Sequence, residues 1–165
     1  MSEPTASPDF AADLNQHLGG WNRTMGLAFT QATAELVVGE LDVSEQHLQP
    51  YGIVHGGVHT GIIEAACSTG AAVAAMRNGQ TVVGLENATS FLRAARGGRL
   101  RVTARPLTRG RRTQVWEAVV QDAAGAILAR GSVRLLCLEP GADIAGSKVA
   151  VESSPPEGVT PREPS

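Results

Sequence analysis

The stretch Gly61-Ile62-Ile63-Glu64-Ala65-Ala66-Cys67-Ser68 lies at the centre of the segment that decides the fold of this chain. From Gly56 to about Arg77, small and apolar residues occupy every side of a helical projection, and Asn78-Gly79 is a stop signal. A helix that is apolar all round is enclosed by the rest of its protein. The pattern therefore predicts one long buried central helix.

Strand-like segments precede and follow this helix. Two of them, 27–31 and 35–43, predict a hairpin, and a short helix over 9–18 that stops at Gly19-Gly20 comes before them. Four more, 81–93, 99–108, 113–121 and 126–138, are joined by Gly-rich turns and predict an antiparallel meander. This order predicts an α+β fold in which an antiparallel sheet is wrapped around one long central helix.

Length and composition fit one compact domain, since the chain has 165 residues of which 42% are hydrophobic. Both ends are rich in Pro, Ser and Glu and poor in large apolar residues. The sequence therefore predicts a disordered N-terminus over 1–8, a folded domain over 9–138 and a disordered Pro/Ser-rich tail over 139–165.

Charge and hydropathy exclude several classes of partner. The formal net charge of −2 leaves no broad basic surface for a nucleic acid. The longest apolar stretch contains His55, His59 and Glu64, so it predicts no membrane span. Residues 1–8 lack the pattern of a signal peptide, which favours a cytoplasmic location. Cys67 and Cys137 show no metal-ligand spacing and are predicted to be free buried thiols.

Glu64 is the candidate catalytic carboxylate. Burying an unpaired carboxylate costs several kcal/mol, so a Glu among small apolar residues needs partners or a purpose. Ser68 one turn later and Thr60 one turn earlier lie on the same helix face and can hydrogen-bond it. The alternative is a Glu that points into solvent or into a subunit contact.

His55-Gly56-Gly57 opens the same helix. Glycines there bring backbone N–H groups close to whatever approaches the positive end of the helix dipole, where a developing oxyanion is stabilised. A close packing turn that tolerates no Cβ is the competing interpretation. The combination with Glu64 nine residues after the histidine favours a catalytic site.

Gly56 and Glu64 are too far apart to act on one carbonyl from a single helix. Eight residues separate them, which is roughly 12 Å along a helix axis. Two such helices running antiparallel across a two-fold axis bring the start of one beside the middle of the other. The spacing therefore predicts a dimer with paired active sites, each with Gly56 from one chain and Glu64 from the other.

The motif Gln49-Pro50-Tyr51-Gly52-Ile53-Val54-His55-Gly56-Gly57, followed by Glu64 and Ser68, resembles the PaaI-like branch of the hotdog-fold thioesterases, in particular the 4-hydroxybenzoyl-CoA thioesterases of the Arthrobacter type. The similarity continues through 87–93 and the last hairpins, over about 110 residues. It implies a hotdog fold and an acyl-CoA thioesterase that releases free acid and CoA.

The resemblance also implies roles for the motif residues. Glu64 is expected to attack the thioester carbonyl or to activate water, while the Gly56 N–H and Gln49 hold the carbonyl oxygen. Ser68 replaces the threonine of the family and keeps its hydroxyl, and His55 is expected to be a structural hydrogen-bonding residue. A homotetramer of paired hotdogs is implied, with no metal or prosthetic group, CoA being part of the substrate.

The phosphates and pantetheine of CoA need a surface between subunits, and arginine side chains suit phosphate oxygens. The alternative for each arginine is a solvated charge on a hairpin. The candidate CoA-binding residues are Ser90, Arg93, Arg109, Arg111, Arg112 and Thr113.

Two rival functions are weighed against hydrolysis. A hotdog hydratase or dehydratase usually has a Pro-Gly at the start of the helix, and here the HGG motif stands in its place. An acyl-CoA binding or sensing module is expected to lack the helical carboxylate or to carry a DNA-binding segment. The acyl group stays open: phenylacetyl-type, hydroxybenzoyl-type and medium-chain groups all fit the sequence.

Overall fold

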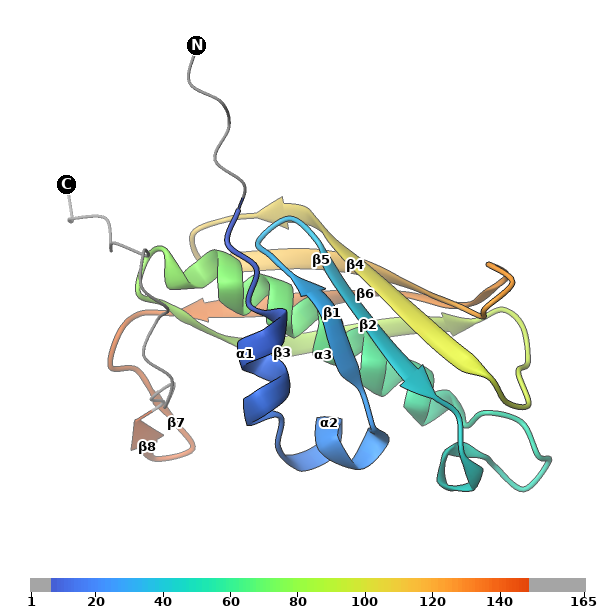
Figure 1. Cartoon of the computed structure of the whole chain (residues 1–165). Coiled ribbons are helices and arrows are strands. Elements are labelled where there is room, and N and C mark those ends of the chain that lie inside the picture. Colours follow the sequence, from blue (N-terminus) through green and yellow to red (C-terminus); the bar gives the residue numbers. More distant parts are fainter. Residues whose placement is uncertain (1–6, 149–165) are drawn as a thin grey trace, which may run out of the picture.

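The computed structural model of the protein describes residues 7–148 (Figure 1). Its main elements are one long helix and a six-stranded antiparallel sheet with the strand order β1-β2-β4-β5-β6-β3. In chain order the elements are α1 (Ala11–His17), α2 (Gly20–Met25), β1 (Ala28–Ala32), β2 (Val37–Asp42), the 3-10 helix η1 (Glu45–His47), α3 (Gly56–Met76), β3 (Thr81–Phe91), β4 (Arg99–Arg109), β5 (Thr113–Gln121), β6 (Ile127–Leu138), β7 (Asp143–Ile144) and β8 (Ser147–Lys148).

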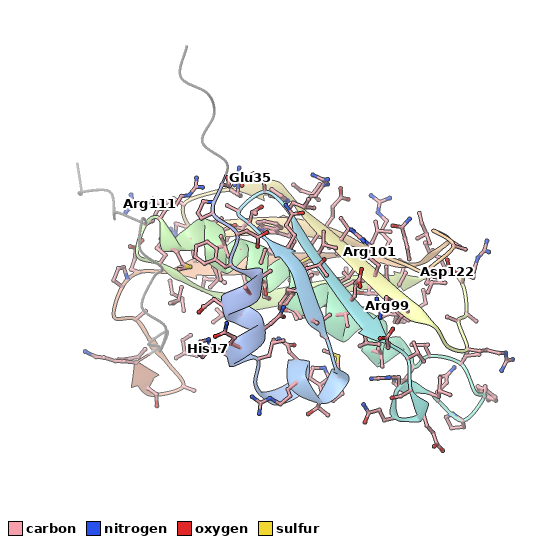
Figure 2. The ribbon with its side chains drawn as sticks, in the orientation of Figure 1. His17, Glu35, Arg99, Arg101, Arg111 and Asp122 are labelled. Carbon is pink, nitrogen blue, oxygen red and sulfur yellow. The ribbon has the colours of Figure 1, made fainter. Side chains whose placement is uncertain are left out.

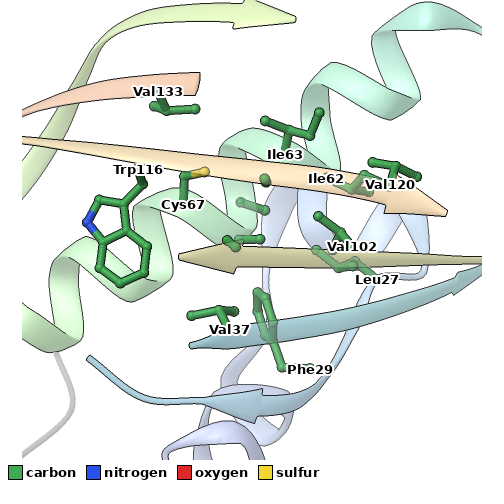
Figure 3. Packing of buried hydrophobic residues seen from close by; sticks show 14 of the residues in the cluster. Leu27, Phe29, Val37, Ile62, Ile63, Cys67, Val102, Trp116, Val120 and Val133 are labelled. Atoms are coloured by element: carbon green, nitrogen blue, oxygen red, sulfur yellow. The ribbon is translucent and has the colours of Figure 1, made fainter. Parts of the chain in front are cut away.

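The core lies between α3 and the face of the sheet that it packs against. Burial alternates along β5 and most of β6, as expected when one face of a sheet is covered. Ile62, Ile63 and Cys67 of α3 belong to the same buried cluster as the sheet residues (Figure 3). A Cβ at Gly70 would collide with the indole ring of Trp116, so a glycine is needed there for α3 to lie close to β5. The prediction of an α+β fold with a sheet around one central helix is confirmed.

The prediction of a four-strand meander is wrong for β3. This strand pairs with β6 at one edge of the sheet, whereas β4 pairs with β2 and β5. The connection 92–98 crosses the end of the sheet instead of forming a tight turn. Its backbone bonds to three other segments: the Leu92 N–H to the carbonyl of Leu128, the carbonyl of Ala95 to Val54, and the carbonyl of Gly98 to Val43.

The N-terminal region contains a helix that the sequence did not predict. Gly20 was expected to end the chain's first helix, and in the structure it begins α2 with a φ of +54°. The glycine allows this left-handed turn between two short helices at little conformational cost. The predicted helix begins at Asp9, whereas α1 begins at Ala11 with Phe10 as its N-cap. The carboxylate of Asp9 accepts from Ala11 N–H at 3.0 Å and from Ala32 N–H at 2.9 Å, which ties α1 to β1.

The described part of the predicted disordered tail, residues 139–148, contains a short hairpin of β7 and β8. Residues 1–6 and 149–165 lie outside the described part of the chain, and with them most of both predicted disordered ends. Within residues 7–148, no helix is long and apolar enough to cross a membrane. Cys67 and Cys137 are free and buried, and burial raises the pKa of the Cys67 thiol.

Candidate active site

The carboxylate of Glu64 is held by two donors from its own chain. Ser68 Oγ donates to Oε1 at 3.2 Å from one helical turn away, as the sequence predicted. Asn87 Nδ2 of β3 donates to Oε2 at 2.9 Å. An ionised carboxylate can accept about four hydrogen bonds, so two positions remain for a substrate or a water molecule. Glu64 is half-buried and neither points freely into solvent nor lacks partners.

Asn87 is a contact of the candidate carboxylate that the sequence did not predict. It lies in the segment 87–93, whose similarity to the family gave it no role. The same amide nitrogen also donates to the carbonyl oxygen of Thr60 at 3.2 Å, and Thr89 Oγ1 donates to Asn87 Oδ1 at 2.7 Å. Thr60 therefore contributes a backbone carbonyl, and no hydrogen bond of the described residues joins its hydroxyl to Glu64. The only sequence signal for this contact was an Asn in the strand that follows the helix containing Glu64.

Gly84 of β3 makes room for the carboxylate. A Cβ at this position would lie 2.7 Å from Oε1 of Glu64, closer than real Cβ contacts allow. The strand also has an irregular register between Gly84 and Glu86 as it pairs with β6. Bulges of this kind change the direction of side chains beside functional sites.

The start of α3 forms a second site, a cleft of about 450 Å³. Three of the predicted catalytic residues, Gln49, His55 and Gly56, line it together with Arg93. His55 is the N-cap of the helix and its Nδ1 accepts from the Gly57 N–H at 2.8 Å, which fixes the first turn. This is the structural role that the resemblance implied for the histidine.

The Gly56 N–H belongs to the first turn of α3 and has no acceptor among the described residues. A Cβ there would lie 2.9 Å from Cζ of Phe91, so the ring would have to shift. The phenyl ring covers this part of the helix, although 58% of Phe91 is exposed. An open donor and a close contact therefore coincide at one residue, and both interpretations of this glycine stay predictions.

The two sites do not meet within one chain. Glu64 and Ser68 do not line the cleft at the start of the helix. Ser68 instead borders a groove of about 360 Å³ between α1, α3 and the start of β3. The walls of that groove are largely apolar and include Ala65, Ala72, Val73 and Val82. Gly56 and Glu64 thus do not line one common cleft, and they lie about 12 Å apart along the helix.

The predicted CoA-binding residues do not form one cluster in a single chain. Arg93 lines the cleft, whereas Ser90 lines another hollow beside Glu117 and Arg130. Arg109 to Thr113 lie at the other end of the sheet, since an 11-residue strand spans roughly 33 Å. Figure 2 shows Arg111 far from Arg99, which begins β4. Arg109 is engaged by Glu35 at 3.4 Å and by the carbonyl of Ala34 at 2.9 Å.

Comparison with known proteins agrees with this architecture. A sequence model of the Thioesterase superfamily matches residues 51–129. The Mycobacterium tuberculosis protein Rv1847 is 39% identical over 135 residues, which cover 81% of this chain and 96% of that protein. Its solved structure superposes with a TM-score of 0.71 over 72% of this chain and 96% of that one.

Two further proteins are similar. The crystal structure of AziG from S. sahachiroi is 40% identical, with a TM-score of 0.72 over 74% of this chain and 98% of that one. The proofreading thioesterase EntH of Klebsiella pneumoniae is 36% identical over 101 residues, which cover 61% of this chain and 73% of that protein.

The sheet around a central helix, together with a carboxylate in the middle of that helix, defines the class of hotdog-fold thioester hydrolases. The extent of the sequence identity places the chain within it: the protein belongs to the Thioesterase superfamily.

Proposed function

We propose that the protein hydrolyses acyl-CoA thioesters to a free acid and CoA, in the manner of the PaaI-like branch, with Glu64 as nucleophile or general base. The observation that carries the proposal is the carboxylate in the middle of α3, oriented by Ser68 and Asn87 and still able to accept further hydrogen bonds. A carboxylate held in one rotamer is suited to attack or to proton abstraction.

Hydrolysis of the thioester can follow two routes. In one, Glu64 removes a proton from water as the water oxygen adds to the thioester carbonyl carbon. In the other, the carboxylate oxygen itself adds, and water later cleaves the resulting anhydride. Both routes pass through an oxyanion, for which the Gly56 N–H and Gln49 are the proposed donors, and both expel CoA as a thiolate.

The packing of β3 on α3 is compatible with the proposed site shared between two chains. Gly56 lies against Phe91 near the end of β3, while Glu64 lies against Gly84 and Asn87. If two β3 strands pair antiparallel with Phe91 opposite the partner subunit's Gly84, the start of one helix comes beside Glu64 of the other.

The surface of β3 favours this pairing. The strand lies at an edge of the sheet, is 11 residues long and is half-buried or exposed along its whole length. Long unpaired edges are normally covered, because their N–H and C=O groups template pairing with another strand. The proposed assembly is therefore a dimer through β3, and the tetramer implied by the family resemblance is a further step of the same proposal.

Arg93 is the proposed contact to CoA, because it borders the cleft that contains Gly56. Ser90, Arg109, Arg111, Arg112 and Thr113 stay predictions that depend on how the subunits assemble. The cytoplasmic location and a reaction without metal or prosthetic group also stay predictions from the sequence.

Two alternatives remain testable: an acyl-CoA sensing module without chemistry, and a hotdog hydratase or dehydratase. A panel of aromatic and aliphatic acyl-CoA thioesters that includes 2-enoyl-CoA and 3-hydroxyacyl-CoA members separates all three. Free thiol release that falls on the order of 10²-fold or more in Glu64→Ala supports hydrolysis. Binding without thiol release supports the sensing module, and a change in the acyl chain without thiol release supports hydration.

Complementation tests the shared site. Glu64→Ala and Gly56→Pro are each expected to be inactive, the second because proline has no N–H. Proline is tolerated at the first helical position, and His55 already has a backbone (φ −65°, ψ 137°) compatible with a following proline. Mixed and refolded together, the two variants regain activity if one chain supplies Gly56 and the other Glu64. Absence of recovery in verified mixed dimers places each site within one chain.

A further inference from the structure

His59 is a buried histidine without a partner. Only 4% of it is exposed, and its Nδ1 is the one buried side-chain nitrogen or oxygen within residues 7–148 that lacks a hydrogen-bond partner. Such groups are rare in folded proteins, and each calls for a ligand, a water molecule or a functional reason.

His47 shows what a satisfied core histidine looks like in the same molecule. It is equally buried at 4% exposure, yet Nδ1 accepts from the Ser44 N–H at 2.9 Å and Nε2 lies 2.9 Å from the carbonyl oxygen of Met25. His59 has no comparable hydrogen bond to any described residue. This difference indicates that His59 has a role beyond packing.

His59 borders the cleft at the start of α3, the same cleft that Gly56 and Gln49 line. It follows Gly56 by three residues, so both lie on one face of the helix, and helical side chains point back toward the N-terminus. Its ring centroid is 6.3 Å from that of Phe91, whose ring also covers Gly56. The imidazole of His59 and the unpartnered Gly56 N–H therefore face the same cleft.

The environment keeps this imidazole neutral. Burial lowers the pKa of His59 below its ordinary value of 6.5. The titratable groups that border the cleft beside it are His55 and Arg93, both exposed, and no carboxylate lines this cleft. A neutral imidazole has one N–H donor and one acceptor nitrogen.

We propose that His59 is a substrate-binding residue whose imidazole N–H hydrogen-bonds the thioester carbonyl oxygen held at the Gly56 N–H. This inference rests on the proposed thioesterase function and adds a donor to the oxyanion site. A carbonyl oxygen that becomes an oxyanion takes two or three donors, and the rest of the cleft wall near His59 is formed by apolar side chains. Those apolar residues are Ile53, Val54, Phe91 and Leu92.

The test compares His59→Leu with His59→Asn, which keeps an amide N–H near the position of Nδ1, the nitrogen without a partner. We expect kcat to fall roughly 10²-fold in His59→Leu, as when one oxyanion donor is removed, and KM to rise by no more than about ten-fold. His59→Asn is expected to recover at least a tenth of the wild-type kcat. Unchanged kcat in His59→Leu would refute the proposal.

Two non-hydrolysable ligands separate this proposal from the proposed function. One is an acyl-CoA analogue with a methylene between sulfur and carbonyl, and the other is an S-alkyl-CoA of equal length without a carbonyl. We expect His59→Leu to weaken binding of the first roughly ten-fold and of the second less than two-fold. Equal weakening of both refutes a carbonyl contact. If the wild type neither binds these ligands nor cleaves any thioester, it is the proposed function that fails.

Thermal unfolding supplies the folding control. His59→Leu removes an unpaired polar group from an apolar wall, so its melting temperature should equal or exceed that of the wild type. His47→Leu, the matched variant, breaks the hydrogen bonds to Ser44 and Met25 and should melt lower. If His59→Leu does not fold, His59→Met takes its place in the same comparison.

Discussion

The start and the middle of α3 differ in whether their hydrogen-bonding groups have partners within the chain. At Glu64 the carboxylate oxygens are each bound by a donor from the same chain. At the first turn the Gly56 N–H and the His59 imidazole have no partner among the described residues. One region is organised before a ligand arrives, whereas the other has hydrogen-bonding groups that no described residue fills.

The two regions therefore suit different roles in catalysis. A reacting carboxylate must be oriented, and each hydrogen bond that orients it excludes rotamers that cannot react. A site for a developing oxyanion must instead keep its donors free until the substrate binds. Substitutions in the two regions should therefore affect catalysis in different ways, most strongly at Glu64.

Glu64→Gln should abolish thioester cleavage while leaving the fold intact. The amide keeps the shape of the side chain but is neither a nucleophile nor a base, so kcat should fall on the order of 10²-fold or more. Thiol release and circular dichroism are the measurements. Glu45→Gln, at an exposed position in η1, is the control and should retain activity. Full activity in Glu64→Gln would remove the middle of the helix from the mechanism.

Gly56→Pro and Gly56→Ala separate the N–H from the space around it. Both variants add a Cβ that must displace the ring of Phe91, and only proline removes the donor. We expect kcat in Gly56→Pro to be roughly 10²-fold below that in Gly56→Ala. Equal kcat values would show that this glycine serves packing alone.

Asn87→Leu should loosen the carboxylate of Glu64. It removes the donor to Oε2, and a hydrogen bond to a charged group contributes about 1.5–3 kcal/mol, so kcat should fall roughly ten-fold or more. Asn78→Ala, in the exposed turn after α3, is the control. A loss seen in KM but not in kcat would contradict an orienting role.

Gly84→Ala should have a smaller effect of the same kind. The added methyl group meets Oε1 of Glu64 and forces the carboxylate to shift by a few tenths of an ångström. We expect a several-fold loss of kcat, since small displacements of a reacting group are costly. Gly97→Ala, where an added Cβ meets nothing within 4 Å, should be neutral in the same assay.

The stability of the protein should depend on pH through His59. Because burial lowers its pKa in the folded state, the unfolded chain binds more protons below about pH 6.5. The contribution of His59 is therefore complete above pH 6.5 and is lost as the pH falls toward the lowered pKa. Urea titrations at pH 7.5 and pH 5.5 should show a smaller drop for His59→Leu than for the wild type. An identical drop would contradict the assignment.

Local patterns were enough to predict much of the fold and part of the site. The all-round apolar pattern of residues 56–77 predicted the central helix to within one residue of its observed end. The Glu64–Ser68 hydrogen bond followed from helical periodicity. The second short helix was missed because a Gly-Gly pair serves equally as a stop and as a left-handed turn between two helices.

Periodicity and helix geometry act over a few residues. The sequence alone therefore predicted the central helix, its carboxylate Glu64, the glycines at its start and the class of fold. Tertiary structure alone decided that β3 pairs with β6, that Asn87 and Gly84 meet Glu64, and that His59 is buried without a partner. These contacts join residues far apart in the chain, and their geometry depends on strand register and on how α3 lies against the sheet, neither of which a single sequence encodes locally.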